Sequence, residues 1–107
     1  MSKSLTTTDE LLENPHPGAG FREDLFEAAE VSVDDAAAAT GLTVDAIEGF
    51  LDGTRRVDAD FDLRLGRYFG FSTGYFLRLQ NAYDLEEAQR AAGHEIDAIQ
   101  PRVEHAA

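Results

Sequence analysis

Apolar residues recur at helical spacing in the second half of the chain. Phe61, Leu65 and Phe69 stand four positions apart, which places them along the buried stripe of one helix. Gly70 is expected to end this helix, because glycine readily adopts the left-handed conformation that closes helices. The pattern therefore predicts an Asp-capped helix that buries these three side chains.

A longer helix is predicted after it, from about Thr73 to Ala92, with Ser72 as its N-cap. Its apolar stripe consists of Tyr75, Phe76, Leu79, Ala82 and Tyr83. This stripe is wide enough for two contacts, so one side can pack on the domain and the other on a partner.

Three shorter helices are predicted in the first half of the chain. The first runs from about residue 21 to residue 30. The second covers 33–40 and follows Ser32, which begins a sequence similar to a capping box. The third covers about 43–52 and ends at Gly53. The pattern as a whole predicts an all-α fold of five helices.

The segment from Val33 to Asp52 fits a helix-turn-helix by residue type. Ala37 is small enough for the point where two helices cross, and Gly41 lies in the turn four residues later. Apolar contacts with the rest of the bundle are expected at Leu42, Ile47 and Phe50. An ordinary helical bundle with an Ala–Gly corner fits the same residues equally well.

The chain has 107 residues, enough for one domain with one core. The stretch NPHPGAG holds two prolines and two glycines in seven residues, so no regular element is expected there. We assign residues 1–14 to a flexible N-terminal arm, 15–93 to the helix-turn-helix domain and 94–107 to a C-terminal tail.

Acidic residues dominate the charge of the chain. The sequence has 21 Asp and Glu against nine Lys and Arg, a net charge of −12. This balance argues against non-specific adhesion to nucleic acid or anionic lipid. A salt-rich cytoplasm, a high-GC genome and a basic partner would each explain it.

Several classes of function find no support in the residues. The chain has no cysteine, and His16, His94 and His105 show no metal-ligand spacing. We therefore expect neither an enzyme nor a bound metal or cofactor. No apolar run approaches the length of a membrane span, and the polar N-terminus lacks the apolar core of a signal peptide. A cytoplasmic protein without membrane contact is expected.

Three stretches resemble the HigA-type antitoxins, a branch of the Cro/repressor-like (XRE) helix-turn-helix superfamily. They are NPHPG near the start, the helix-turn-helix, and STGYFLRLQNAYDLEEA after it. The run from Phe76 to Leu85 is the most specific, and the resemblance covers roughly Asn14 to Gln89. It implies a five-helix Cro/repressor-like (lambda repressor-like) domain. It also implies a homodimer formed by the last helices, a RelE-fold ribonuclease toxin as partner, and repression of the protein's own operon.

The resemblance places an acidic helix at the DNA-facing position. Where family members commonly present Ser, Arg, Gln or Asn, this chain has Thr43, Val44, Asp45, Glu48 and Gly49. A carboxylate about 6 Å from a phosphate costs about 2–3 kcal/mol at an effective dielectric near 20. We expect Asp45 to interact with the positive end of the helix dipole and Glu48 to be a solvated surface residue, so operator binding is in doubt.

Two arginines beyond this helix supply the cations that the helix lacks. Arg55 and Arg56 stand where the fold brings a loop near the DNA backbone, and guanidinium groups suit phosphate. Pairing with Asp52, Asp58 or Asp60 is an equally good interpretation. The candidate DNA-contacting residues are therefore Thr43, Val44, Asp45, Glu48, Arg55 and Arg56.

A helix-turn-helix protein usually reads two half-sites as a dimer. We assign the homodimer interface to Tyr75, Leu79, Ala82 and Tyr83. RelE-fold ribonucleases are typically basic, so an acidic antitoxin would be complementary to one in charge. The principal hypothesis is an antitoxin that neutralises such a toxin and regulates its operon. A solitary regulator of the same superfamily, and an interaction module that has lost DNA binding, remain alternatives.

Overall fold

The computed structural model describes residues 12–102, and five helices follow one another in this range. They are η2 (Arg22–Glu27), α1 (Val33–Thr40), α2 (Val44–Asp52), α3 (Ala59–Phe69) and α4 (Tyr75–Asp97). The all-α, five-helix prediction is confirmed, and no strand occurs in this part of the chain. Most of the predicted N-terminal arm (1–11) and the end of the predicted tail (103–107) lie outside the described residues.

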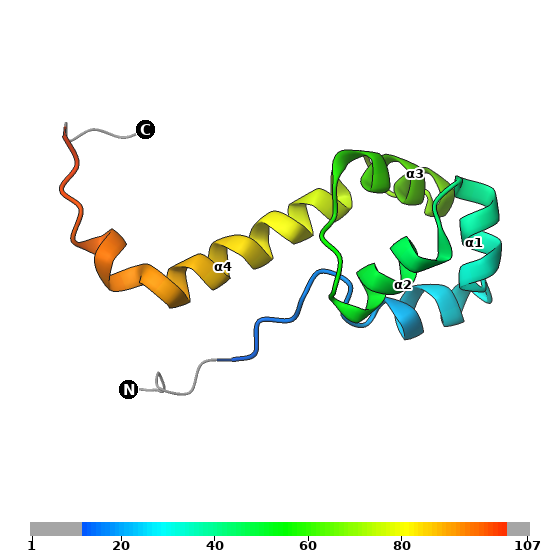
Figure 1. Ribbon diagram of the computed structural model, residues 1–107, viewed down its shortest axis with the longest axis horizontal. Helices are drawn as coiled ribbons and strands as arrows, with labels where there is room; N and C mark the ends of the chain where they lie inside the picture. Colours follow the sequence, from blue (N-terminus) through cyan, green and yellow to red (C-terminus); the bar gives the residue numbers. More distant parts are fainter. Residues whose placement is uncertain (1–11, 103–107) are drawn as a thin grey trace.

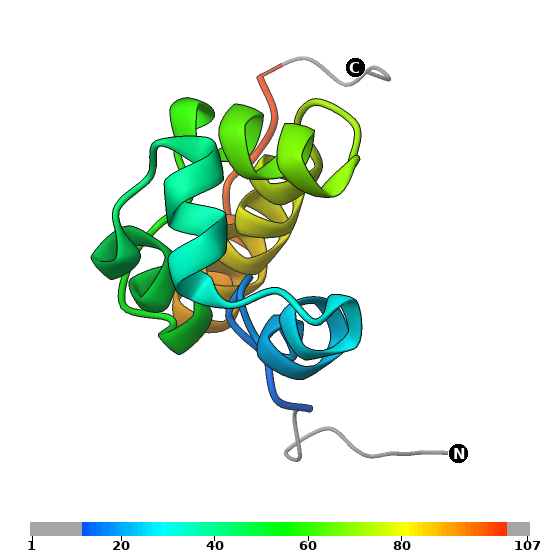
Figure 2. The same ribbon diagram turned by 90° about the vertical axis from the view of Figure 1, so that its right-hand side faces the viewer.

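The first four helices form a cluster from which α4 projects (Figure 1). α1 packs against α2 and α3, and α3 packs against the start of α4. Figure 2 looks nearly along α4 and shows α1 in front of the cluster. The segment before η2 runs beside α4, where the Asn14 amide donates to the Tyr83 carbonyl at 3.2 Å. None of the helices within residues 12–102 combines the length and apolar character needed to cross a bilayer.

Phenylalanine rings form the centre of the core. The Phe50 ring of α2 lies 5.0 Å from the Phe61 ring and 5.5 Å from the Phe76 ring, measured between centroids. Phe21 stacks on the other side of Phe50 at 5.8 Å. Phe61 and Leu65 are fully buried and Phe69 is half-buried, so the predicted stripe of α3 is confirmed. Burial of each such side chain contributes about 1.5–3 kcal/mol, which makes this cluster the main source of stability.

The first helix winds more widely than an α-helix. Arg22–Glu27 form a π-helix, with helical residues at 21 and 28–29 on either side. Phe26 is its buried residue, while Phe21 and Leu25 are half-buried. The predicted position of the helix is therefore confirmed, but no residue pattern in the sequence indicates the π-helical winding.

Most predicted helix ends are confirmed in atomic detail. The Ser32 hydroxyl accepts a hydrogen bond from the Asp35 amide, and the Thr43 hydroxyl accepts one from the Ala46 amide, both at 3.0 Å. Each bond satisfies an amide that the first turn of a helix leaves free. Gly41, with φ of 81°, closes α1 in the left-handed conformation.

The predicted N-cap of α4 is wrong. Ser72 does not cap the helix, which begins after Gly74. The carboxylate of Asp62, buried in α3, accepts hydrogen bonds from the amides of Gly74 and Phe76 at 2.7 Å and Leu77 at 3.2 Å. The Ser72 hydroxyl instead accepts from Arg78. A carboxylate from a neighbouring helix therefore takes the role that sequence assigns to the local serine.

The far end of α4 also differs from the expected one. The sequence predicts an end near Ala92, and the backbone does leave the helical conformation at this residue, with φ of −136° and ψ of 20°. The chain is helical again after Ala92 and remains so to Asp97, and the Ala98 amide donates a hydrogen bond to the His94 carbonyl. Gly93, which follows the kink, marks a break in the helix rather than its end.

The NPHPG stretch packs tightly against the C-terminal end of α2. A methyl group at buried Gly18 would lie 1.9 Å from the carbonyl oxygen of Phe50. The Nδ1 atom of His16 accepts a hydrogen bond from the Gly18 amide at 3.1 Å, and its ring lies against Gly53. His16 is thus a loop-packing residue.

Candidate nucleic-acid interface

The helix-turn-helix consists of α1, the turn at Gly41 and α2. Ile47 and Phe50 of α2 are buried, which leaves the opposite face of this helix free for a ligand. Val44 is 39% exposed, and the Thr43 hydroxyl is engaged as a helix cap. Val44 therefore presents an exposed apolar side chain on this face, and the Thr43 hydroxyl is occupied by its cap.

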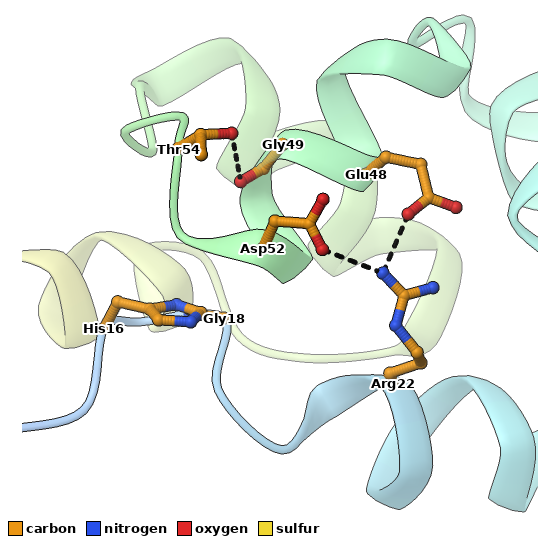
Figure 3. Close-up of polar contacts among 7 residues, drawn as sticks. All are labelled: His16, Gly18, Arg22, Glu48, Gly49, Asp52 and Thr54. Atoms are coloured by element: carbon orange, nitrogen blue, oxygen red, sulfur yellow. Dashed lines mark hydrogen bonds and ion pairs between the residues drawn. The ribbon is translucent and has the colours of Figure 1, made fainter.

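The carboxylates of this face are partly neutralised by Arg22 from η2 (Figure 3). Its Nη2 atom lies 2.8 Å from an oxygen of Glu48 and 3.2 Å from an oxygen of Asp52. The hydrogen bond to Glu48, followed by the charges of Glu48 and Asp52, raises the pKa of Arg22. Glu48 is therefore ion-paired rather than freely solvated, and the face presents less negative charge than its sequence indicates.

Asp45 is the third carboxylate on the outer face of α2. It lies exposed in the first turn of α2, where the helix dipole stabilises a carboxylate. Among residues 12–102 no ion pair involves it. Asp45, Glu48 and Asp52 are three carboxylates against the one guanidinium of Arg22, so two negative charges remain on the outer surface of α2.

Arg56 is held by α4. Its guanidinium makes two hydrogen bonds to the Asp84 carboxylate, at 3.1 and 2.6 Å. The partners predicted by proximity in sequence are wrong, because each is already engaged. Asp52 pairs with Arg22, the Asp58 carboxylate caps α3, and Asp60 pairs with Arg64.

The hydrogen bond from Arg56 lowers the pKa of Asp84, with a smaller contribution from the Gln80 amide. A carboxyl whose pKa falls on folding adds stability above its unfolded-state pKa and loses it as pH falls through the folded-state pKa. The ordinary value is 3.8, so Asp84 stays ionised at neutral pH. The pair with Arg56 therefore does not respond to pH changes in the physiological range.

Arg55 lies at the edge of the α2 face. Its amide donates to the Gly49 carbonyl at 3.1 Å, and its Cβ would lie 3.0 Å from a Cβ added at Gly49. The side chain is exposed, and no ion pair in the described part of the chain involves it. Arg55 is therefore the cation most available to a phosphate beside α2.

The residues assigned to the dimer interface line one groove. Tyr75, Leu79, Ala82 and Tyr83 face the segment 13–19 across a cavity of about 490 Å³. Tyr75 also stacks on Phe71, with 4.5 Å between ring centroids. The stripe of α4 is thus partly covered by the chain's own N-terminal segment.

Two residues of this region, Arg22 and Asp84, are not among the site residues that the sequence predicts. A signal existed for Arg22, which is the single Lys or Arg between Lys3 and Arg55. An isolated cation among many carboxylates is expected to find a carboxylate partner. No comparable signal existed for Asp84, which lies 28 residues from Arg56 in sequence.

Known proteins share both sequence and fold with this chain. Virulence-associated protein I from Dichelobacter nodosus is 35% identical over 75 residues, which cover 70% of this chain and 69% of that protein. An addiction module antidote protein of the HigA family from Coxiella burnetii is 30% identical, with a TM-score of 0.74. The match covers 84% of this chain and 99% of that one. The chain belongs to the HigA family of antitoxins.

A further HigA antitoxin has been solved with DNA. The Pseudomonas aeruginosa antitoxin HigA, in a structure with the higBA promoter, is 29% identical to this chain, with a TM-score of 0.75. The match covers 85% of this chain and 100% of the Pseudomonas aeruginosa chain. No family model matches the chain. The HigA relationship identifies the chain as an antitoxin-type helix-turn-helix regulator, and its α1–α2 pair is the helix-turn-helix.

Proposed function

We propose that this HigA-type protein acts in the cytoplasm as a homodimer that neutralises a RelE-fold ribonuclease toxin and represses its own operon. The observation that carries the proposal is the complete helix-turn-helix frame on a chain of the HigA family. The buried residues of α1 and α2 preserve this frame although the exposed residues are acidic.

The charge of the chain supports the toxin as partner. A net charge of −12 attracts a basic RNA-binding protein, steering the encounter and raising the association rate. The groove of α4 that contains Tyr75 and Leu79 is proposed as the homodimer surface, because two half-sites require two copies of α2.

The contacts around α2 support operator binding. Arg22 partly offsets Glu48 and Asp52, and Arg55, beside Gly49, takes part in no ion pair among residues 12–102. The remaining charge of Asp45 favours the alternative of an interaction module without DNA binding. With so few cations near α2, affinity for DNA is expected to depend on a small number of phosphate contacts.

Replacing Arg22 by glutamine is expected to weaken operator binding without unfolding the protein. The substitution leaves Glu48 and Asp52 uncompensated beside the DNA backbone. Loss of one effective cation lowers affinity by about threefold to tenfold at low salt. Fluorescence anisotropy measures this change. Arg67→Gln, which also removes one exposed positive charge but lies on α3, is the control and should bind as the wild type does.

Co-expression with the product of the adjacent toxin gene tests the toxin part of the proposal. The tagged chain is expected to co-purify with the toxin and to restore growth of cells that express it. A matched test uses Arg22→Gln, which changes the DNA-facing helix and should still neutralise the toxin. Failure of the wild-type chain both to co-purify and to restore growth would overturn the antitoxin role.

A further inference from the structure

A chain of hydrogen bonds joins the loop after α2 to the middle of α4. The Val57 amide donates to the Gln80 side-chain oxygen at 2.9 Å, and the Gln80 amide nitrogen donates to Asp84 at 3.1 Å. Asp84 in turn accepts both hydrogen bonds from Arg56. Gln80 is only 4% exposed, so this network is anchored in the domain at one end and open to solvent at Arg56.

A small cavity of about 100 Å³ opens beside this network. Thr54, Arg55 and Arg56 line it from the loop, and Gln80 and Tyr83 line it from α4. The donors that suit an oxyanion here are the guanidinium groups of Arg55 and Arg56, because the Thr54 hydroxyl already donates to the Gly49 carbonyl and the Gln80 amide to Asp84. At present the oxyanion held by Arg56 is the carboxylate of Asp84.

We propose that this cavity binds one phosphate of the DNA backbone, and that the Asp84 carboxylate competes with this phosphate for Arg56. The proposal rests on the proposed function of the chain as a DNA-binding regulator. Carboxylate and phosphate both bind guanidinium through two parallel hydrogen bonds, so they compete for the same donor atoms of Arg56. Asp84 lowers DNA affinity because the phosphate must displace it from Arg56.

The geometry allows a phosphate to displace Asp84 from Arg56. The Arg56 side chain is 70% exposed, so a phosphate can reach the guanidinium from solvent. Gln80 keeps its bond to the Val57 amide when Arg56 leaves, which holds the loop in place. Asp84 would retain its hydrogen bond from Gln80, so its charge is not left without a partner.

Asp84→Asn tests the competition, with Asp97→Asn as the matched control. Both variants remove one carboxylate from α4, but only the first frees Arg56. Anisotropy is measured on the DNA upstream of the gene and on a scrambled duplex, over a salt series. Asp84→Asn is expected to bind both duplexes about threefold to tenfold tighter than Asp97→Asn at low salt, with a salt slope steeper by about 0.9.

The double variant Arg56→Gln/Asp84→Asn tests whether Arg56 is responsible for the gain in DNA affinity. It is expected to lose the gained affinity, because the freed cation is then absent. Thermal unfolding of each variant confirms that it is folded. If Asp84→Asn does not fold, the test moves to the wild type. Its Arg56 Nε–Hε resonance is then expected to shift on addition of duplex while that of Arg90 stays unchanged.

The outcomes separate this proposal from the proposed function. Equal affinities of Asp84→Asn and Asp97→Asn, or an Arg56 signal that bound duplex leaves unmoved, would overturn the competition by Asp84 even if the operator is preferred. A gain in affinity of Asp84→Asn for both duplexes, without any operator preference, supports phosphate binding in this cavity and overturns the regulator function. No duplex binding by any variant at low salt overturns both.

Discussion

Replacing Asp62 by alanine is expected to lower the free energy of unfolding by about 3–5 kcal/mol. The Asp62 carboxylate is 1% exposed and accepts three amide hydrogen bonds at the start of α4. Its removal leaves the amides of Gly74, Phe76 and Leu77 without their acceptor and takes a negative charge from the positive end of the helix dipole. The contact between α3 and the first turn of α4 depends on these bonds.

Chemical denaturation followed by circular dichroism measures the loss. Asp60→Ala is the control, because Asp60 lies two residues away on the exposed side of α3, where it pairs with the exposed Arg64. Exposed pairs of this kind contribute about 0–1 kcal/mol. Asp62→Asn should fall between the two, since its amide keeps one acceptor oxygen. Equal stability of Asp62→Ala and Asp60→Ala would show that the carboxylate does not hold α4.

Replacing Gly18 by alanine is the second change with a large expected effect, about 2–4 kcal/mol of unfolding free energy. The added methyl group would lie 1.9 Å from the Phe50 carbonyl oxygen and 2.7 Å from its carbonyl carbon. Both are backbone atoms of α2, so no side-chain rotation relieves the overlap. The NPHPG segment would have to move away from the end of α2.

Gly66→Ala is the matched control for this substitution. A methyl group at Gly66 in α3 would lie 3.7 Å from the nearest atom, the Phe71 carbonyl oxygen, which is ordinary contact. Alanine in a helix is about 0.5–1 kcal/mol more favourable than glycine, so this variant should gain stability. Thermal unfolding compares the two. A Gly18→Ala chain as stable as Gly66→Ala would contradict the tight packing of NPHPG on α2.

The features predicted correctly from sequence are those that nearby residues determine. Ser32 and Thr43 cap their helices by accepting hydrogen bonds from amides three positions later, and Gly41 ends its helix by adopting the left-handed conformation. Phe61 and Leu65 are buried because their helical spacing places them on one face. Each signal lies within one or two turns of helix, so the printed sequence contains it.

The features that sequence analysis missed depend on residues brought together by folding. Asp62 caps a helix that begins more than ten positions later, and its burial removes Ser72 from the role of cap. Arg22 and Asp84 reach the recognition region from the first and last helices. Pairing rules based on proximity in sequence could not choose them, because several closer carboxylates were available to each arginine.

The acidic recognition helix is therefore less unfavourable to DNA than its sequence indicates. Ion pairing inside the molecule offsets Glu48 and Asp52, although it also withdraws Arg56. Among residues 12–102 this leaves Arg55 as a cation without an ion pair, against Asp45 and the negative charge that a single Arg22 leaves on Glu48 and Asp52. Affinity for DNA is then the difference between a small attraction from the cations and a small repulsion from the carboxylates. The salt dependence of binding measures the number of phosphate contacts that contribute to it.

Fluorescence anisotropy with the DNA upstream of the gene tests operator binding most directly. The wild-type chain is titrated over a salt series, and a scrambled duplex of equal length is the reference. We expect tighter binding to the upstream DNA and a shallow decrease of affinity with rising salt, since few phosphates are contacted. Equal affinity for the two duplexes at every salt concentration would contradict the assignment of α2 as an operator-reading helix.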